Sequence, residues 1–236
     1  MDYFCGLIHG DTGAGKTVFG GSMAQVVRTL HICIDRYAEE TLKTIPGDRE
    51  IRSPSDFSSL VKYHRYLAAG KHNFGGWVID SVTQGIQNFR VELTGVGANN
   101  YHKTPMLSWM ELYERWRLLL KDFIALPMHG MILAMSQREL DELEPGTKEE
   151  PNYIVKPFIE TKLRDVIGGY LPALGFCYKK HTGGRNHYYI SFERGGIDTK
   201  LCGAKLPQME DPTFAKVWQA IQKQQNKKGE ENEREN

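Results

Sequence analysis

The sequence predicts an α/β fold with a mostly parallel central sheet, helices on both of its faces and an antiparallel hairpin near the carboxyl end. Over the first two thirds of the chain, short apolar runs alternate with longer segments whose apolar residues recur at helical spacing. This alternation is typical of parallel sheets, in which a helix connects one strand to the next. Two later runs rich in Tyr, Phe and Ile are separated by Thr182-Gly183-Gly184-Arg185, which favours a hairpin.

Length and composition indicate a single folded unit. A chain of 236 residues can bury one sizeable core, and we expect residues 1–222 to form one domain. Residues 223–236 carry no apolar side chain, so we expect a polar, disordered tail. The 30 basic and 29 acidic residues nearly balance, which excludes a protein that is held on nucleic acid by its overall charge.

The cysteines and the hydropathy pattern indicate a cytoplasmic protein. Cys5, Cys33, Cys177 and Cys202 are widely separated and form no C-x-x-C pair, as in reduced proteins without disulfides or a zinc site. No apolar run approaches the roughly 18 residues of a membrane-spanning helix. The first apolar run begins at residue 3, so we expect neither a signal peptide nor a membrane partner.

The first strand, expected at Tyr3–His9, leads into a sequence of the form G-x-x-x-x-G-K-[ST], which is the pattern of a phosphate-binding loop. Its glycines permit positive φ and leave the backbone amides open to an anion. Lys16 would reach the β- and γ-phosphates, and the positive end of the following helix, at about 16–28, faces the same point. The alternative is a strand-to-helix turn that fits the pattern by chance. The residues expected to bind nucleotide are Gly10, Asp11, Thr12, Gly13, Ala14, Gly15, Lys16, Thr17 and Val18.

Three more parallel strands are expected after this loop. Leu30–Asp35 and Trp77–Asp80 are apolar runs that end in an acid, and Met131–Ser136 follows the helix stop at Pro127. Helical spacing and capping residues predict helices at about 55–69, 104–126, 158–167 and 211–222. We expect a helical turn and flexible loop at 84–103, and a long polar loop at 138–157.

Polar side chains gather at the carboxyl ends of these strands, where parallel sheets bind their ligands. Asp80 closes its strand in the manner of a Walker B acid, which holds Mg²⁺ directly or through water. The Thr17 hydroxyl would take another Mg²⁺ position. The sequence therefore predicts a site for ATP and Mg²⁺, with Thr17 and Asp80 as the metal-binding residues. The alternative for Asp80, a cap on the next helix, is compatible with that role.

Hydrolysis also needs a group that activates water and a group that senses the γ-phosphate. Asp35, Glu39 and Glu40 follow the second strand and are the candidate bases. Gln137, after the fourth strand, is placed to sense the γ-phosphate, although it could be an ordinary loop residue. Arg194, after the hairpin, could act as an arginine finger on a neighbouring subunit, or could be a solvated surface residue. With Lys16, these are the candidate catalytic residues.

Two local patches combine basic and aromatic residues, a combination that can hold phosphates and stack bases. A solvated, lysine-rich hairpin edge is the alternative for the second patch. The segment 138–165 has more acidic than basic residues, which disfavours nucleic acid there. The first patch contains Lys62, His64, Arg65, Lys71 and His72, and the second contains Tyr178, Lys179, Lys180, His181, Arg185, His187, Tyr188 and Tyr189.

These features together resemble a known family. The features that carry the resemblance are the early loop at Gly10–Thr17, the segment Trp77-Val78-Ile79-Asp80-Ser81, the helix ending at Leu126-Pro127, the strand ending Ala134-Met135-Ser136-Gln137 and the late hairpin. With them the chain resembles the phage-encoded RecA-like P-loop ATPases, the Sak-type single-strand annealing proteins. The resemblance implies a RecA-like core, ATP and Mg²⁺, single-stranded DNA binding in recombination or annealing, and homo-oligomers. It also implies the host cell cytoplasm, with other phage or replication proteins as partners.

The chain departs from that family at two points. Tyr37 stands where the family has a catalytic glutamate, and Phe192-Glu193-Arg194 keeps the family's arginine but not its lysine. Either change would slow hydrolysis. A P-loop protein whose nucleotide state controls a protein assembly, as in packaging or remodelling, is therefore the alternative function. A small-molecule kinase is the third, although the loop at 138–165 offers few arginines as a lid.

Overall fold

The computed structural model describes residues 2–95, 106–141, 146, 147, 150, 152–193, 195, 197–202 and 204–235, and every structural statement below refers to them. Their strands form one ten-stranded sheet in the order β10-β8-β7-β1-β5-β4-β2-β3, with β6 beside β5 and β9 beside β7. The strands are β1 (Cys5–Gly10), β2 (Thr29–Cys33), β3 (Arg49–Arg52), β4 (Gly76–Asp80), β5 (His129–Leu140), β6 (Tyr153–Pro157), β7 (Ala173–Thr182), β8 (Arg185–Ser191), β9 (Lys200–Leu201) and β10 (Met209–Glu210).

The strands from β7 to β3 run parallel, and the strands beyond β7 are antiparallel. β1 pairs in parallel with β5 on one side and with β7 on the other, and β4 pairs in parallel with β5 and β2. β7 turns back into β8 through a tight turn at Gly183 and Gly184, both with positive φ. The expected α/β class, with a parallel core and an antiparallel hairpin, is confirmed.

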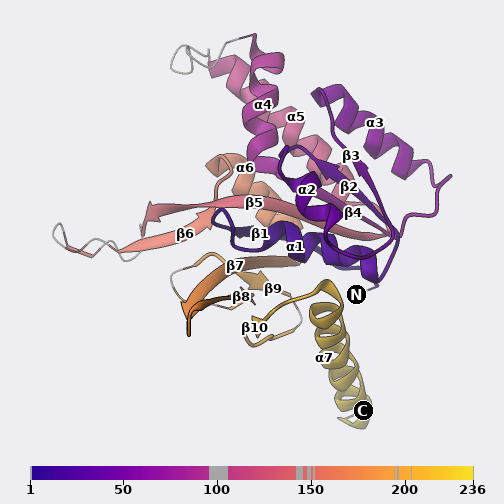
Figure 1. Ribbon diagram of the computed structural model, residues 1–236, viewed down its shortest axis with the longest axis vertical. Coiled ribbons are helices and arrows are strands. Elements are labelled where there is room, and N and C mark those ends of the chain that lie inside the picture. Colours follow the sequence, from indigo (N-terminus) through magenta and orange to yellow (C-terminus); the bar gives the residue numbers. More distant parts are fainter. Residues whose placement is uncertain are drawn as a thin grey trace.

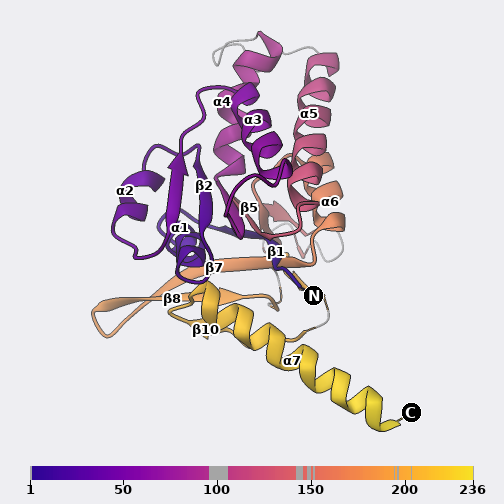
Figure 2. The ribbon, with the colours of Figure 1, turned by 90° about the vertical axis from the view of Figure 1, so that its right-hand side faces the viewer.

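Helices lie on both faces of this sheet (Figures 1 and 2). One apolar cluster joins α3, α4, α5 and α6 to the sheet, and a second cluster joins α1, the 3-10 helix η1 and α7 to the other face. α2 packs beside α1 against the end of β2. The helices are α1 (Lys16–Gly21), η1 (Ser22–Gln25), α2 (Ala38–Lys43), α3 (Phe57–Ala68), α4 (Val82–Thr94), α5 (Met106–Ile124), α6 (Thr161–Tyr170) and α7 (Phe214–Glu235).

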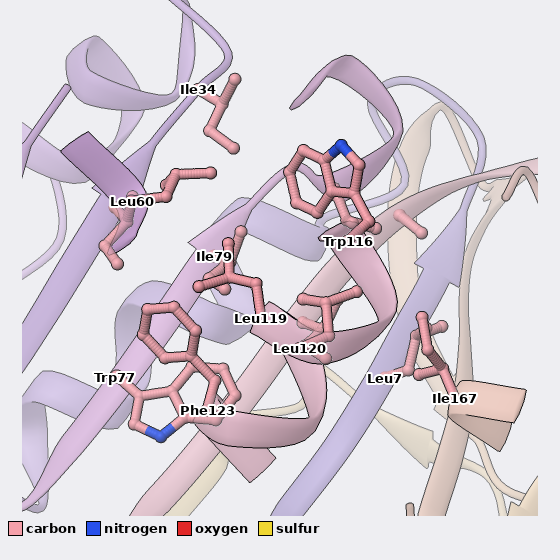
Figure 3. Close-up of a cluster of buried hydrophobic side chains, with 14 of the residues drawn as sticks. Leu7, Ile34, Leu60, Trp77, Ile79, Trp116, Leu119, Leu120, Phe123 and Ile167 are labelled. Atoms are coloured by element: carbon pink, nitrogen blue, oxygen red, sulfur yellow. The ribbon is translucent and has the colours of Figure 1, made fainter. Parts of the chain in front are cut away.

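The larger cluster fixes the sheet under α5 (Figure 3). Trp116, Leu120 and Phe123 recur at helical spacing on α5 and are all fully buried. The ring of Phe123 lies 5.1 Å from that of Trp77 on β4, which is also fully buried. Each such side chain contributes about 1.5–3 kcal/mol by leaving water. The apolar stripe on α5 is therefore core, and it holds β4, the strand that ends in Asp80.

The region read from the sequence as a long loop at 138–157 is in part a strand pair. β5 continues through Leu140, and β6 returns antiparallel to it, with Ser136 opposite Pro157. In Figure 1 these two strands project beyond the body of the sheet. The charged residues that favour a loop, such as Arg138 and Glu139, lie on this projection, where β5 is no longer fully buried. Residues 84–94, expected as a helical turn at the start of a loop, belong to the longer helix α4, and residues 96–105 lie outside the described residues.

The carboxyl end also differs from expectation. We expected the last helix to end near residue 222, but α7 continues to Glu235 and extends away from the sheet (Figure 2). Its first part packs on the sheet through Phe214, Val217, Trp218 and Ile221. The rest is rich in Gln, Lys and Glu, whose high helix propensity favours a helix there. Within the described residues, no helix has both the length and the apolarity that crossing a membrane requires.

Candidate functional site

The loop between β1 and α1 is shaped by three glycines. Gly13 and Gly15 have φ of 72° and 89°, the left-handed region that favours glycine. Gly10 has no positive φ, but a Cβ there would lie 2.2 Å from the carbonyl oxygen of Cys177 on β7. Only glycine therefore fits at the point where β1 turns into the loop. The glycines of the motif are needed for the local backbone path as well as for access to an anion.

Lys16 lies under this loop and is buried. Its Nζ donates hydrogen bonds to the carbonyl oxygens of Gly10 and Asp11, at 2.7 and 2.9 Å. Burial lowers the pKa of its ammonium from the ordinary value, and the nearby acids Asp80, Asp11 and Asp35 act against that shift. Neutral carbonyl oxygens are weaker partners for an ammonium than phosphate oxygens are. The arrangement therefore leaves Lys16 ready to contact a phosphate chain.

Thr17 and Asp80 come together beside Lys16. The Thr17 hydroxyl donates a hydrogen bond of 2.8 Å to Oδ2 of Asp80, the last residue of β4. A hydroxyl and a carboxylate are the hard oxygen ligands that Mg²⁺ prefers. Within the described residues, no group of three or more His, Cys, Asp or Glu side chains could hold a metal. A pair of protein oxygens fits Mg²⁺ that takes its other ligands from phosphate and water.

His31 adjoins Asp80 and was not singled out from the sequence. Its side chain is fully buried on β2, with Nε2 3.7 Å from Oδ2 of Asp80. Neither ring nitrogen has a hydrogen-bond partner within the described residues. The signal in the sequence was a histidine inside the apolar run Leu30–Asp35. Its place beside Asp80 follows from the register of β2 with β4, where His31 pairs with Val78, and that register is not visible in the sequence.

The three candidate bases occupy different positions. Asp35 lines the same cleft as Lys16, and its Oδ1 accepts a hydrogen bond of 3.0 Å from the backbone amide of Tyr37. Glu39 and Glu40 lie on α2 and do not line the cleft. Both pair with Lys43, and their side chains are 44% and 74% exposed. Of these three candidate bases, Asp35 alone lines the cleft.

Gln137, the candidate γ-phosphate sensor, does not line this cleft. Met135 lines the cleft, but Gln137 lies two residues further along β5, where its amide donates a hydrogen bond to Glu139. Gln137 lines a separate hollow of about 290 Å³ together with Asp11. The role of Gln137 in γ-phosphate sensing remains a prediction. Arg194 lies outside the described residues.

The cleft itself has a volume of about 370 Å³ and collects most of the predicted nucleotide-binding residues. Tyr188 of the hairpin also lines the cleft, although the sequence predicts it only as part of a nucleic-acid patch. Position in the sequence alone could not reveal this, because β8 reaches the loop through the pairing of β7 with β1. The cleft is lined by Thr12, Gly13, Ala14, Gly15, Lys16, Thr17, Val18, Asp35, Tyr37, Ala38, Thr41, Asp80, Ser81, Met135 and Tyr188.

Comparison with known proteins places the fold. No protein-family model and no curated protein matches the sequence. Among solved structures, the flagellar accessory protein FlaH from Methanocaldococcus jannaschii is 11% identical, with a TM-score of 0.50, over 88% of this chain and 84% of that chain. The KaiC-like protein PH0186 from Pyrococcus horikoshii OT3 is 10% identical, with a TM-score of 0.51, over 88% and 83%.

The chain has the RecA-like P-loop fold. In this RecA-like sheet, β5 lies between the strand that leads into the phosphate-binding loop and the strand that ends in Asp80. β1 and β4 end at the same edge on either side of β5, because Gly10 pairs with Met135 while Asp80 pairs with Leu133. The fold expectation drawn from the resemblance is thus confirmed, and the site lies where parallel sheets bind ligands.

Proposed function

We propose that this protein is a Mg²⁺-dependent ATPase. The observation that carries the proposal is the convergence of Lys16, Thr17 and Asp80 at one edge of the sheet, beneath a glycine loop with open amides. The amides of Gly13, Gly15, Lys16 and Thr17 and the Lys16 ammonium would hold the phosphates, and Val18 would contact the nucleotide beside them. When bound, Mg²⁺ would be held by Thr17 and Asp80 and would supply positive charge to the β- and γ-phosphates.

Hydrolysis requires water to attack the γ-phosphorus as the bond to the bridging oxygen of ADP breaks. In this proposal Asp35 accepts the proton of the attacking water, and Lys16 stabilises the charge that develops on the phosphate oxygens. The position of Asp35 supports this role, because it lies at the end of β2 and its amide donates a hydrogen bond of 3.1 Å to the carbonyl of Asp80. That contact fixes Asp35 relative to the metal-binding carboxylate.

Asp35→Asn is expected to lower ATP turnover about a hundredfold, the lower range for loss of a general base. ATP affinity should change little, because Asp35 contacts water rather than phosphate in this proposal. Phosphate release measures the turnover, and a nucleotide titration measures the affinity. Glu39→Gln and Glu40→Gln are the comparison variants. If either of them lowers turnover as much as Asp35→Asn does, the base lies on α2 instead.

The finer proposal is that the ATPase acts on single-stranded DNA in recombination or annealing. One face of the β7–β8 hairpin supports it. The rings of Tyr178 and Tyr189 stack at 5.3 Å, and Lys180 Nζ lies 5.7 and 5.3 Å from their centroids. Tyr178 is buried, so Tyr189 is the ring that, together with the exposed Lys180, can stack a base and hold its phosphate. His187 on this face pairs with Glu210, which reduces the positive charge there.

Lys180→Gln and Tyr189→Ala are expected to weaken retention of single-stranded DNA by about tenfold each, because base stacking and phosphate contacts contribute about 1–3 kcal/mol apiece. Filter binding at low salt measures the retention, since phosphate contacts weaken steeply as salt rises. The wild type should also hydrolyse ATP faster when single-stranded DNA is added. A wild type with no DNA retention and no stimulation would exclude the DNA function.

The second candidate is an ATPase whose nucleotide state controls a protein assembly. Two observations favour it. The structural neighbour FlaH is named as a flagellar accessory protein, and apolar residues stand exposed at the rim of the cleft, with Val18 48% and Tyr37 83% exposed. A partner subunit that covered this rim would bury them, as in a homo-oligomer. Light scattering with and without ATP distinguishes this function, because it predicts nucleotide-dependent oligomers whether or not DNA is present.

A further inference from the structure

The β7–β8 hairpin has two faces, and only one of them carries the stacked tyrosines. Side chains alternate between the faces of a strand, and residues directly opposite each other in an antiparallel pair share a face. Lys179 lies opposite Tyr188, whereas Lys180 lies opposite His187 and Tyr178 lies opposite Tyr189. Lys179 and Tyr188 therefore point to the other side, the side of the phosphate-binding loop.

Both side chains reach that loop. A Cβ placed on Gly15 would lie 3.2 Å from Cδ1 of Tyr188, and a Cβ placed on Gly13 would lie 3.5 Å from Nζ of Lys179. The tyrosine ring and the lysine ammonium are thus in direct contact range of the two loop glycines with positive φ. The hairpin forms a wall beside the loop, and Tyr188 is one of the residues that line the cleft.

Nothing else in the described part of the chain engages the Lys179 ammonium, which makes no hydrogen bond or ion pair there. An exposed lysine gains little from lying near a glycine, but beside bound phosphates it would form a charge-assisted contact. Tyr188 is 36% exposed and lies near the other end of the loop. The same cleft is also lined by Val18 and Tyr37, whose side chains offer apolar surface suited to a nucleoside.

We propose that Lys179 and Tyr188 complete the nucleotide site from the hairpin, with the Lys179 ammonium on the phosphate chain and the Tyr188 ring against the nucleoside. This inference rests on the proposed ATP site at Gly10–Val18. The two faces of the hairpin then have different ligands, because one face contacts the nucleotide and the other carries Lys180 and the stacked tyrosines proposed to bind DNA. A substitution on one face should therefore change the binding of one ligand and not of the other.

Titration calorimetry with two probes, ATP and inorganic triphosphate, tests both contacts in the presence of Mg²⁺. Lys179→Gln is expected to weaken the binding of both probes about tenfold, the effect of losing one hydrogen bond to a charged group. Tyr188→Ala is expected to weaken ATP binding by a similar factor and to leave triphosphate binding unchanged, because triphosphate has no nucleoside. Both side chains are partly or fully exposed, so the variants should fold normally.

Matched controls come from α6, on the other face of the sheet. Lys162→Gln and Tyr170→Ala change exposed residues of the same two types and should bind ATP like the wild type. If Lys179→Gln and Tyr188→Ala also bind both probes like the wild type, the inference is overturned. Lys16→Ala in the same assay separates this outcome from failure of the ATP site itself. Loss of binding in Lys16→Ala alone refutes only the hairpin contacts, and unchanged binding in Lys16→Ala refutes the proposed function.

Discussion

Lys16→Ala is expected to lower ATP turnover about a thousandfold, which corresponds to about 4 kcal/mol of transition-state stabilisation. The reason lies in the position of its ammonium, which is buried beneath the loop with only two carbonyl oxygens as strong hydrogen-bond partners. A buried charge interacts strongly with the charge that develops on a phosphate, because little water screens it. ATP affinity should fall as well, although the loop amides of Gly13 and Gly15 remain in place.

The fold should survive this substitution. Lys16 contacts the loop rather than the apolar clusters, and the carbonyl oxygens of Gly10 and Asp11 that it leaves can accept hydrogen bonds from water in the cleft. Circular dichroism and thermal unfolding check this point, and Lys223→Ala, an exposed lysine on α7, is the control. A Lys16→Ala protein that is folded and still turns over ATP like the wild type would contradict the proposed site.

The part of the candidate site whose arrangement follows from the sequence is its local part. Lys16 lies in a loop whose spacing is set by a few consecutive residues, and Asp80 ends an apolar strand of ordinary length. The convergence of these strand ends follows from a general property of parallel sheets. The structure adds the 2.8 Å hydrogen bond from the Thr17 hydroxyl to Asp80, so these two residues are in direct contact.

The sequence did not predict the positions of side chains that depend on long-range strand pairing or on which way a side chain points from its helix. The sequence analysis groups Lys179 and Lys180 in one basic patch, but the register of β7 with β8 places their side chains on opposite faces of the hairpin. Glu39 and Glu40 were read as following a strand, and the short helix α2 was not foreseen, so their outward direction and their pairing with Lys43 could not be expected. Asp35, still attached to the strand end, keeps its place in the cleft.

Asp80→Asn is expected to weaken ATP binding in the presence of Mg²⁺, to strengthen it in EDTA, and to lower turnover about a thousandfold. An ionised carboxylate beside the phosphates repels them unless a cation lies between, and that cation contributes several kcal/mol to catalysis. In the presence of Mg²⁺ the wild type should therefore bind ATP more tightly than the variant. In EDTA the order should reverse, because the amide carries no charge. The Asn oxygen can still accept the Thr17 hydroxyl, so the local structure should persist.

Titration of each protein with ATP, once with Mg²⁺ and once with EDTA, gives the four affinities that decide the matter. Asp122→Asn, an exposed carboxylate on α5, should respond to Mg²⁺ like the wild type. If Asp80→Asn weakens ATP binding equally in both conditions, Asp80 supports the loop but does not hold a metal. If the variant binds ATP more weakly than the wild type with Mg²⁺ and more tightly in EDTA, the carboxylate and the cation act as a pair. The 2.8 Å contact with Thr17 then marks the point where Mg²⁺ would bind. Loss of turnover alone could not distinguish these cases, because a displaced loop and a missing cation both slow hydrolysis.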